Sequence, residues 1–235
     1  MITFYGQVAS FGQGMGVLVQ KKKLRRNRVY SGGVIAELDI FEEACKLADT
    51  QYEQMVTEAK NSFGDAVAMM VWSHQLLIQD EGFRSKIREL IQSENISANQ
   101  AIMSIAMEYV QLMSDSLDAY LRERGQDIIY VAEWLMDCCS IVSERDQVIN
   151  CELIKNQEKH PVIIIGRNFG LEDVLVAKQN QFSGMIDIEG SLESHTVMLA
   201  KELKIPMLIK LKEEIKSYVN RLAMLNTVDG CIQIE

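Results

Sequence analysis

The apolar positions of the chain change their period along its length. From about Ile35 they recur every three or four residues, as on one face of a helix, at Leu38, Phe41, Cys45, Ala48, Tyr52, Met55 and Ala59. The segment "SFGD" at 62–65 interrupts this pattern. The next stretch, "AVAMMVWSHQLLIQD", is apolar on more than one side, which indicates a helix that is buried or lies at an interface.

More helices follow in the middle of the chain. The stretch "GFRSKIRELIQ" predicts a short helix, and Ser97 with Gln100 in "SANQ" has the pattern of a capping box. From there to about Ile141 the pattern predicts two long helices that meet near residues 114–118. Helices in sequence with short breaks between them predict a helical bundle.

Both ends of the chain have the pattern of strands. The stretches "TFYGQVAS" and "GQGMGVLVQ" predict short strands near the N-terminus. After Glu158, the predicted strands "PVIIIG", "FSGMIDIEG" and "IPMLIKL" alternate with the predicted helices "LEDVLVAK" and "SHTVMLAKELK". We therefore expect an α/β subdomain made of residues 1–32 together with 145–235, with an all-α bundle of residues 33–144 inserted into it.

Composition narrows the classes of function. The 235 residues carry a formal net charge of -9, which argues against nucleic acid as the main partner and fits a basic protein partner. Apolar runs stay short of the roughly 18 residues that a membrane span needs, and the start has no signal-peptide pattern. The five cysteines form no CxxC pair, which favours reduced thiols. We expect a cytoplasmic protein that does not associate with a membrane.

The strongest candidate for chemistry is His195, in "GSLESHTVMLAKELKIP" at 190–206. At a helix N-terminus the partial positive charge favours the neutral imidazole, which is the nucleophilic form. The backbone N–H groups there can donate hydrogen bonds to an anion such as a phosphoryl group. Ser194 caps the helix and offers a hydroxyl. The alternative is a histidine that begins a helix and has no chemical role. The residues alone leave both open.

Two further stretches have charged or apolar candidates. In "YLRERGQDIIYVAEWL", Arg124 stands near a helix start, where a guanidinium suits phosphate; the alternative is a solvated face on which Arg124 pairs with Asp127. In "VWSHQLLIQDE", His74 lies on a very apolar helix and is expected in the core or at an interface rather than as a ligand. Met69, Met70 and Leu77 on the same helix suit a strip that binds a partner.

Several stretches resemble motifs of one family, in the family's order. They are "GQVASFGQGMGVLV", "VWSHQLLIQDEGF", "YLRERGQDIIYV", "GLEDVLVAK", "GSLESHTVMLAKELKIP" and the "VDG" at 228–230. The fifth is similar to the family's GGRTSHxxIxARxxxIP. Together they make the chain resemble the N-terminal half of enzyme I of the phosphoenolpyruvate-dependent sugar phosphotransferase system.

The resemblance implies a fold and a reaction. Its fold is an α/β phosphohistidine subdomain with an inserted helical subdomain. The family's histidine accepts a phosphoryl group from phosphoenolpyruvate bound to a separate C-terminal barrel, and passes it to a histidine of the carrier protein HPr, which docks on the helical subdomain. By motif, His195 is then the phosphoryl carrier, Ser194 its neighbour, and Arg124 a residue that faces the transfer site. The implied docking residues are Met69, His74, Leu77, Asp80 and Leu121.

The chain also departs from the family's motifs near the histidine. Leu192 and Glu193 stand where the family has arginine and threonine, and Val174 stands where it has a hydroxyl. Glu193 is unfavourable there, because a carboxylate repels a phosphoryl group of charge about -1.5 to -2.

Two hypotheses follow. In the first, the chain is a phosphotransferase module that carries a phosphoryl group on His195 and exchanges it with an HPr-like carrier. It cannot use phosphoenolpyruvate alone and has no cofactor of its own, since magnesium belongs to the absent barrel, which acts in cis or in trans. In the second, the chain is a degenerate adaptor that binds an HPr-like carrier without being phosphorylated.

Overall fold

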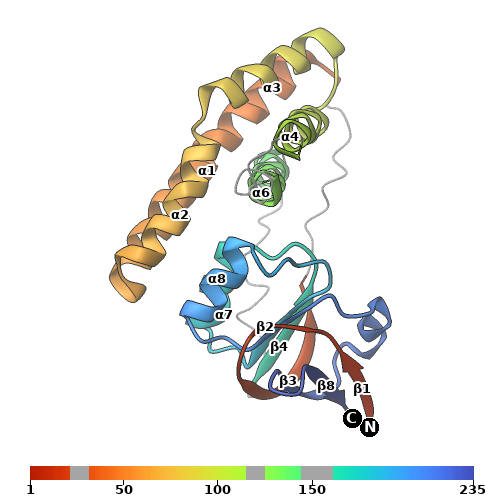
Figure 1. Cartoon of the computed structure of the whole chain (residues 1–235). Coiled ribbons are helices and arrows are strands. Elements are labelled where there is room, and N and C mark those ends of the chain that lie inside the picture. The colour runs from red at the N-terminus through yellow and green to blue at the C-terminus, as the bar shows by residue number, and fades with distance from the viewer. Residues whose placement is uncertain (22–31, 115–124, 144–160) are drawn as a thin grey trace. The chain divides into compact units, whose positions relative to one another are not determined.

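The computed structural model describes residues 1–21, 32–114, 125–143 and 161–235 (Figure 1). The chain forms two compact units, which we call the α/β unit (Met1–Lys22 with Leu153–Glu235) and the helical unit (Lys23–Glu152). The predicted fold class, α/β with an inserted helical bundle, is confirmed. The predicted boundaries at 32/33 and 144/145 stay predictions, because residues 22–31 and 144–160 lie outside the described ranges.

One mixed sheet of eight strands forms the centre of the α/β unit. The strands are β1 (Ile2–Tyr5), β2 (Gln7–Ser10), β3 (Gln13–Gln20), β4 (Val162–Gly166), β5 (Gly184–Asp187), β6 (Met207–Ile209), β7 (Leu222–Asn226) and β8 (Cys231–Ile234). Their order across the sheet is β1-β8-β7-β3-β4-β5-β6-β2. Strands β3, β4, β5 and β6 are parallel, and the remaining neighbours pair antiparallel.

The parallel strands are connected by helices, as parallel pairing requires. Helix α7 (Leu171–Gln179) joins β4 to β5, and α8 (His195–Glu202) joins β5 to β6. A 3-10 helix, η1 (Glu213–Tyr218), follows β6. An apolar core lies against one face of the sheet and consists of Leu18, Ile163, Ile165, Ile186, Ile188, Leu208, Leu211, Ile215, Ala223, Leu225, Ile232 and Ile234. Both helices therefore begin at the carboxyl edge of the parallel strands.

The first predicted strand is corrected by the structure. The stretch "TFYGQVAS" is not one strand: it breaks at Gly6, and β1 and β2 lie at opposite edges of the sheet. A Cβ on Gly6 would lie 2.2 Å from Leu211 Cδ1 and 2.9 Å from the main-chain oxygen of Ile209, so any other residue would force these neighbours to shift. The strands β7 and β8 were not predicted.

The helical unit contains α1 (Val34–Phe63), α2 (Asp65–Ile78), α3 (Glu81–Glu94), α4 (Ala98–Ser114) and α6 (Gly125–Ser143). The predicted break at 62–65 is confirmed: Gly64, with φ of 89°, separates α1 from α2. Asp80 begins α3, and its carboxylate accepts a hydrogen bond from Phe83 N at 2.6 Å. Within the described residues, no helix has the length and apolar character needed to cross a membrane.

Three side chains bind main-chain N–H groups at the start of α4. The predicted capping box is confirmed, because Ser97 Oγ accepts from Gln100 N at 3.3 Å while Ser97 N donates to Gln100 Oε1 at 3.1 Å. A further amide of the first turn, Ala98 N, donates to Glu37 Oε2 of α1 at 2.9 Å. Glu37 is fully buried. A carboxylate on one helix therefore caps another helix that begins 61 positions later.

The described cysteines are buried in the two units. Cys45, Cys138, Cys139 and Cys231 are free thiols. Burial raises the pKa of the Cys45 thiol from 9.0 to about 12. Because the thiolate is the reactive form, Cys45 is a packing residue at neutral pH.

Glu37→Ala should destabilise the helical unit by about 1–3 kcal/mol, because it leaves the buried N–H of Ala98 without an acceptor. Both tryptophans, Trp72 and Trp134, lie in this unit, so urea unfolding followed by tryptophan fluorescence reports on it alone. The control is Glu43→Ala, an exposed carboxylate on the same helix, which should change the free energy of unfolding by less than about 0.5 kcal/mol. Equal effects of the two variants would contradict the role of Glu37.

Candidate functional site

The N-terminus of α8 presents the predicted histidine at the carboxyl edge of the sheet. His195 is the first residue of α8, and Ser194 is its N-cap. The Ser194 hydroxyl accepts from Val197 N at 3.2 Å and donates to Ser191 O at 2.9 Å. The predicted capping by Ser194 is therefore confirmed, and the hydroxyl proton is directed to the preceding loop.

The first turn of α8 has the features that an anion on His195 needs. The first amides of an α-helix have no acceptor within the helix, and the partial positive charge of the dipole is concentrated there. A phosphoryl group on the imidazole would meet this end of the helix. The geometry is therefore suited to a histidine that carries a phosphoryl group.

The loop between β5 and α8 is packed tightly against the sheet. A Cβ on Gly190 would lie 2.9 Å from Ile209 Cγ2 and 3.2 Å from Asp187 Cβ, so a larger residue there would force these side chains to shift. Asp187, at the end of β5, is buried and accepts hydrogen bonds from Glu189 N and Phe169 N, both at 3.1 Å. Burial raises the pKa of the Asp187 carboxyl above 3.8, although these hydrogen bonds and Lys21 act against the rise.

The departures from the family's motifs differ in their surroundings. Glu193 is exposed, so water and salt screen its repulsion of a phosphoryl group. Val174 is fully buried in α7 and gives that helix no hydroxyl at this position. Leu192 brings no charge to the loop.

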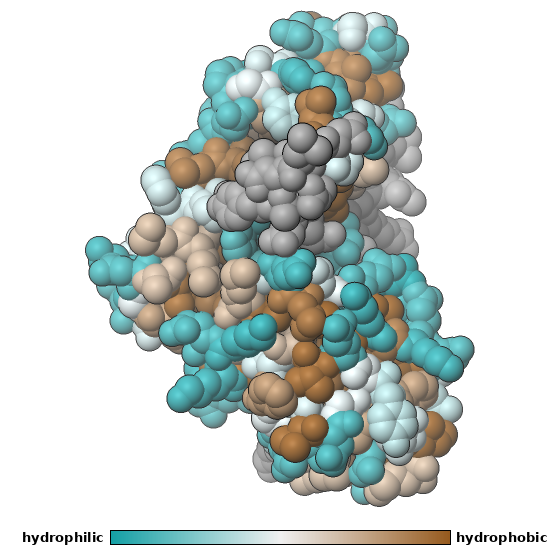
Figure 2. All heavy atoms as spheres, in the orientation of Figure 1, coloured by the Kyte–Doolittle hydropathy of each residue, from teal (hydrophilic) through white to brown (hydrophobic). Residues whose placement is uncertain are grey.

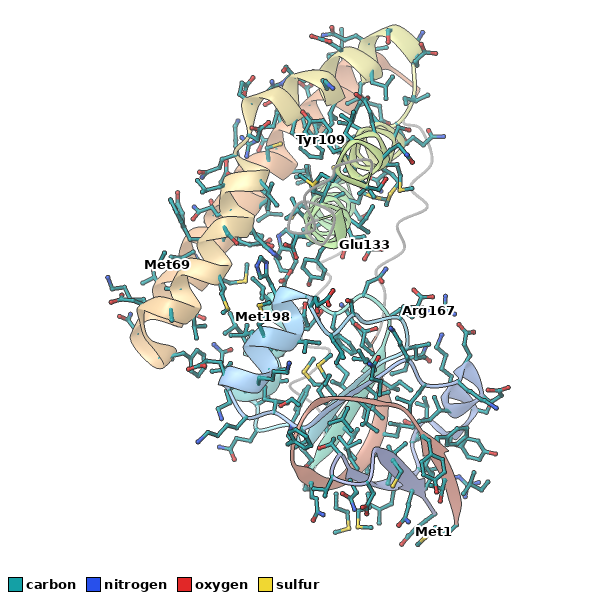
Figure 3. The ribbon with its side chains drawn as sticks, in the orientation of Figure 1. Met1, Met69, Tyr109, Glu133, Arg167 and Met198 are labelled. Atoms are coloured by element: carbon teal, nitrogen blue, oxygen red, sulfur yellow. The ribbon has the colours of Figure 1, made fainter. Side chains whose placement is uncertain are left out.

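Two cations follow the neighbouring parallel strands. Lys21, after β3, donates to Asp173 Oδ2 at 2.5 Å and to Asn168 O at 3.2 Å. Arg167 (labelled in Figure 3) follows β4. It pairs with Glu189 at 3.0 Å and also with Glu213. Both cations have carboxylate partners, so neither is a simple substitute for the arginine that Leu192 replaces.

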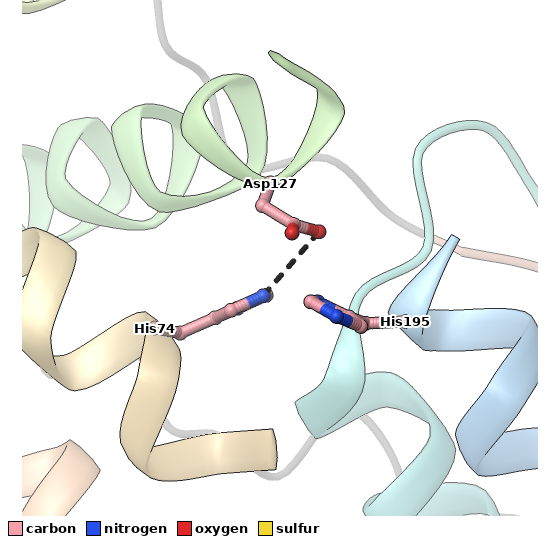
Figure 4. A group of neighbouring side chains, drawn as sticks. All are labelled: His74, Asp127 and His195. Carbon is pink, nitrogen blue, oxygen red and sulfur yellow. Dashed lines mark ion pairs between the residues drawn. The ribbon is translucent and has the colours of Figure 1, made fainter. Parts of the chain in front are cut away.

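The predicted docking residues of the helical unit lie in different surroundings. Met69 is exposed on α2, and Leu77 is half-buried. Asp80 is exposed and caps α3. His74 is buried: its Nε2 lies 3.5 Å from Asp127 Oδ1, an ion pair if the imidazole is protonated, and its ring centroid lies 6.0 Å from that of Tyr130 (Figure 4). Leu121 and Arg124 lie outside the described residues.

The structure adds two residues to the candidate docking surface. Met69, Trp72 and Leu76 are spaced as one face of α2 and are between 46% and 66% exposed. We call these three residues the α2 stripe. Light-brown atoms gather over α2 on the left flank of the molecule (Figure 2). The exposure of Trp72 and Leu76 was not predicted, because the helix is apolar on several sides and its sequence does not show which side is covered.

Comparison with known proteins identifies the family. Residues 5–124 match the family described as "PEP-utilising enzyme, N-terminal", and residues 158–231 match "PEP-utilising enzyme, mobile domain". The chain belongs to the family of phosphoenolpyruvate-utilising enzymes. The resemblance to the N-terminal half of enzyme I is thereby confirmed.

Curated relatives share about a quarter of their residues with the chain. "Phosphoenolpyruvate-protein phosphotransferase" of Buchnera aphidicola subsp. Baizongia pistaciae is 25% identical over 205 residues, which cover 84% of this chain and 34% of the relative. "Multiphosphoryl transfer protein 1" of Escherichia coli (strain K12) is 26% identical over 234 residues, which cover 98% of this chain and 27% of the relative. The chain thus spans about a third or less of the length of these relatives.

Solved structures show the same fold. A solution structure of Enzyme I superposes with a TM-score of 0.71 at 21% identity and covers 99% of this chain and 92% of that chain. A structure titled "N-terminal domain of Enzyme 1 - Nitrogen" superposes with a TM-score of 0.64 at 14% identity. The match covers 98% of this chain and 93% of that chain.

The buried carboxyl of Asp187 predicts a pH-dependent difference between the wild type and Asp187→Asn. In the pH interval from 3.8 up to the raised pKa of Asp187, this carboxyl has lost its proton in the unfolded chain and retains it in the folded chain. The stability of the wild type relative to the variant should therefore fall as the pH rises, by at most about 1.4 kcal/mol per pH unit. Urea unfolding at several pH values, followed by NMR signals of the α/β unit, measures this difference.

Ser194→Ala is the control for that experiment. It removes the cap of α8 and should cost about 1 kcal/mol, but it removes no titratable group. Its deficit should therefore stay constant over the same pH range. A constant difference for Asp187→Asn as well would contradict the effect of burial on Asp187.

Proposed function

We propose that the chain is a cytoplasmic phosphoryl-transfer module that carries a phosphoryl group on His195 and exchanges it with a histidine of an HPr-like carrier. The observation that supports it best is the position of His195, as the first residue of a capped helix at the carboxyl edge of parallel strands. Membership of the phosphoenolpyruvate-utilising family supports the choice of chemistry.

The reaction is a displacement at phosphorus. A ring nitrogen of His195 attacks the phosphoryl group of the carrier's phosphohistidine, an N–P bond forms, and the N–P bond of the carrier breaks. The carrier's imidazole leaves with the electron pair of that bond and takes up a proton. The protein contributes position and electrostatic stabilisation, since phosphoryl transfer needs little else from it.

The source of the phosphoryl group is part of the proposal. We propose that these 235 residues take it from a phosphorylated carrier, or from a phosphoenolpyruvate-binding domain in cis or in trans. The relatives named phosphoenolpyruvate-protein phosphotransferases are about three times as long as the matched part. Magnesium, where it acts, would belong to that other domain.

The charge of the helical unit supports a basic partner. It contains 12 Lys and Arg against 22 Asp and Glu, whereas the α/β unit contains 12 against 11; together these are the 24 basic and 33 acidic residues of the chain. The exposed carboxylates Asp65 and Asp80 lie at the two ends of the α2 stripe. An apolar strip between carboxylates suits a carrier whose docking face is apolar with basic residues around it.

The adaptor hypothesis is the competing function. Val174 is buried and offers no hydroxyl, Leu192 brings no charge, and the Ser194 hydroxyl already donates to Ser191 O. A protein with this loop and an intact α2 stripe could bind a carrier without accepting its phosphoryl group. The two functions differ in one observable, a covalent bond at His195.

The first test is uptake of label from a phosphorylated HPr-type carrier by the wild type and by His195→Ala. We expect label on the wild type, none on the variant, and a product that is labile in acid and stable in base, as phosphohistidine is. Calorimetric titration with unphosphorylated carrier is run beside it. No label with intact binding would establish the adaptor, and label on His195→Ala would exclude His195 as the carrier residue.

The second test concerns docking. Leu76→Glu places a charge at one end of the α2 stripe and should weaken carrier binding by roughly 2 kcal/mol, about 30-fold, as measured by calorimetry. Binding by the wild type should also weaken as salt is raised, because the helical unit is acidic.

The matched control is Met224→Glu. Met224 is 44% exposed on β7 in the α/β unit, against 46% for Leu76. The Met224→Glu substitution introduces the same charge at an equally exposed apolar site and should leave carrier binding unchanged. Equal losses in the two variants would show that net charge, and not the α2 stripe, determines the affinity.

A further inference from the structure

One buried residue, Phe169, is held through its main chain by the segment that carries His195. Phe169 lies between β4 and α7 and is 4% exposed. Its N–H donates to Asp187 Oδ2 at 3.1 Å, and its carbonyl accepts from Thr196 Oγ1 at 2.8 Å. We call these three residues the Phe169 clamp. Both polar groups of one residue's main chain are therefore bound by side chains of one other segment.

The two side chains of the clamp stand at the two ends of the segment that contains the histidine. Asp187 ends β5, and Thr196 is the second residue of α8, directly after His195. Asp187 is 3% exposed and Thr196 is 7% exposed. Hydrogen bonds shielded from water in this way are costly to break, because each partner would be left buried and unsatisfied.

A third contact holds Phe169 from its ring side. The Lys21 ammonium lies 5.1 Å from the centroid of the Phe169 ring and donates to the carbonyl of Asn168 at 3.2 Å. Asn168 has a φ of 52°, in the left-handed region that Asn tolerates better than most residues. The loop after β4 is thus fixed by β3 as well as by the segment after β5.

We propose that Asp187 and Thr196 are positioning residues for His195, acting through the main chain of Phe169. The proposal rests on the function proposed above. Thr196 is bonded to a fixed carbonyl one residue after the histidine, so the first turn of α8 cannot rotate or shift without breaking that bond. Asp187 fixes the other end of the segment to the same residue. The imidazole is therefore aimed before a phosphoryl donor arrives.

Thr196→Val tests the proposal, because it keeps the shape of the side chain and removes the donor to Phe169. Thr196→Ser restores the hydroxyl. The matched control is Thr227→Val: Thr227 is also buried in the α/β unit, and its hydroxyl donates to the carbonyl of Gly12 at 2.8 Å. Both valine variants lose a hydroxyl that donates to a main-chain carbonyl, and Thr227→Val also removes the acceptor of Gly12 N–H at 2.7 Å. We expect both to lower the thermal midpoint. Only Thr196→Val should affect His195.

Two readouts follow His195 itself. The first is the nitrogen resonances of its imidazole by NMR, which should shift in Thr196→Val, return in Thr196→Ser and stay unchanged in Thr227→Val. The second is the rate of labelling by phosphoramidate, a small donor that needs no docking. There, a ring nitrogen of His195 forms the N–P bond, the N–P bond of the reagent breaks, and ammonia leaves with the imidazole proton. We expect a rate about 10- to 100-fold lower in Thr196→Val.

With the phosphorylated carrier as donor, Thr196→Val should lower kcat and leave KM unchanged, because the proposed docking surface is the α2 stripe. Asp187→Asn is the second route, for the case that Thr196→Val does not fold, and should shift the same imidazole resonances. Identical resonances and rates in Thr196→Val and Thr227→Val would overturn the proposal. If the wild type accepts nothing from the carrier, the proposed function fails alone, since the imidazole resonances still test the positioning.

Discussion

The hydrogen bonds on the main chain of Phe169 determine where the first turn of α8 lies. A buried peptide group left without a hydrogen-bond partner costs more free energy than one hydrogen bond contributes to stability. The position of this turn is therefore fixed mainly by the cost of leaving these groups buried and unsatisfied. Asp187 shows what the arrangement requires: its carboxylate is buried, and its pKa is raised because the charged form has lost its water. The sheet is the rigid frame, and the clamp fixes to it the turn that begins with His195.

The local pattern of residues was enough to predict much of the fold. The break at Gly64, the capping box of Ser97 with Gln100 and the cap by Ser194 all depend on neighbours within a few positions, where spacing carries the information. The split at Gly6 was missed because β1 pairs with β8 and β2 pairs with β6, and both partners are distant in sequence. β7 and β8, of five and four residues, were also missed.

The site was predictable only in part, for the same reason. His195 and Ser194 form a local signal that begins a helix, and the motifs gave them a role. The clamp joins Phe169 to residues 18 and 27 positions away, and no periodic pattern relates them. The cap of α4 by Glu37 spans 61 positions and was equally invisible. Buried polar side chains that bond across the fold are therefore the part of this site that a single sequence does not reveal.

The distribution of charge separates two tasks that the proposed reaction needs. Attraction of a partner works over a distance and benefits from a net charge, and the helical unit holds an excess of ten carboxylates. Transfer works at contact and suffers from the same charge, since a phosphoryl group is itself an anion. The α/β unit is close to neutral, and its cations Lys21 and Arg167 are held by carboxylates. Without the family's arginine in this loop, stabilisation of a phosphoryl group depends more on the N-terminus of α8 and on accurate placement of the imidazole. The Phe169 clamp therefore matters more here than it would beside a free cation.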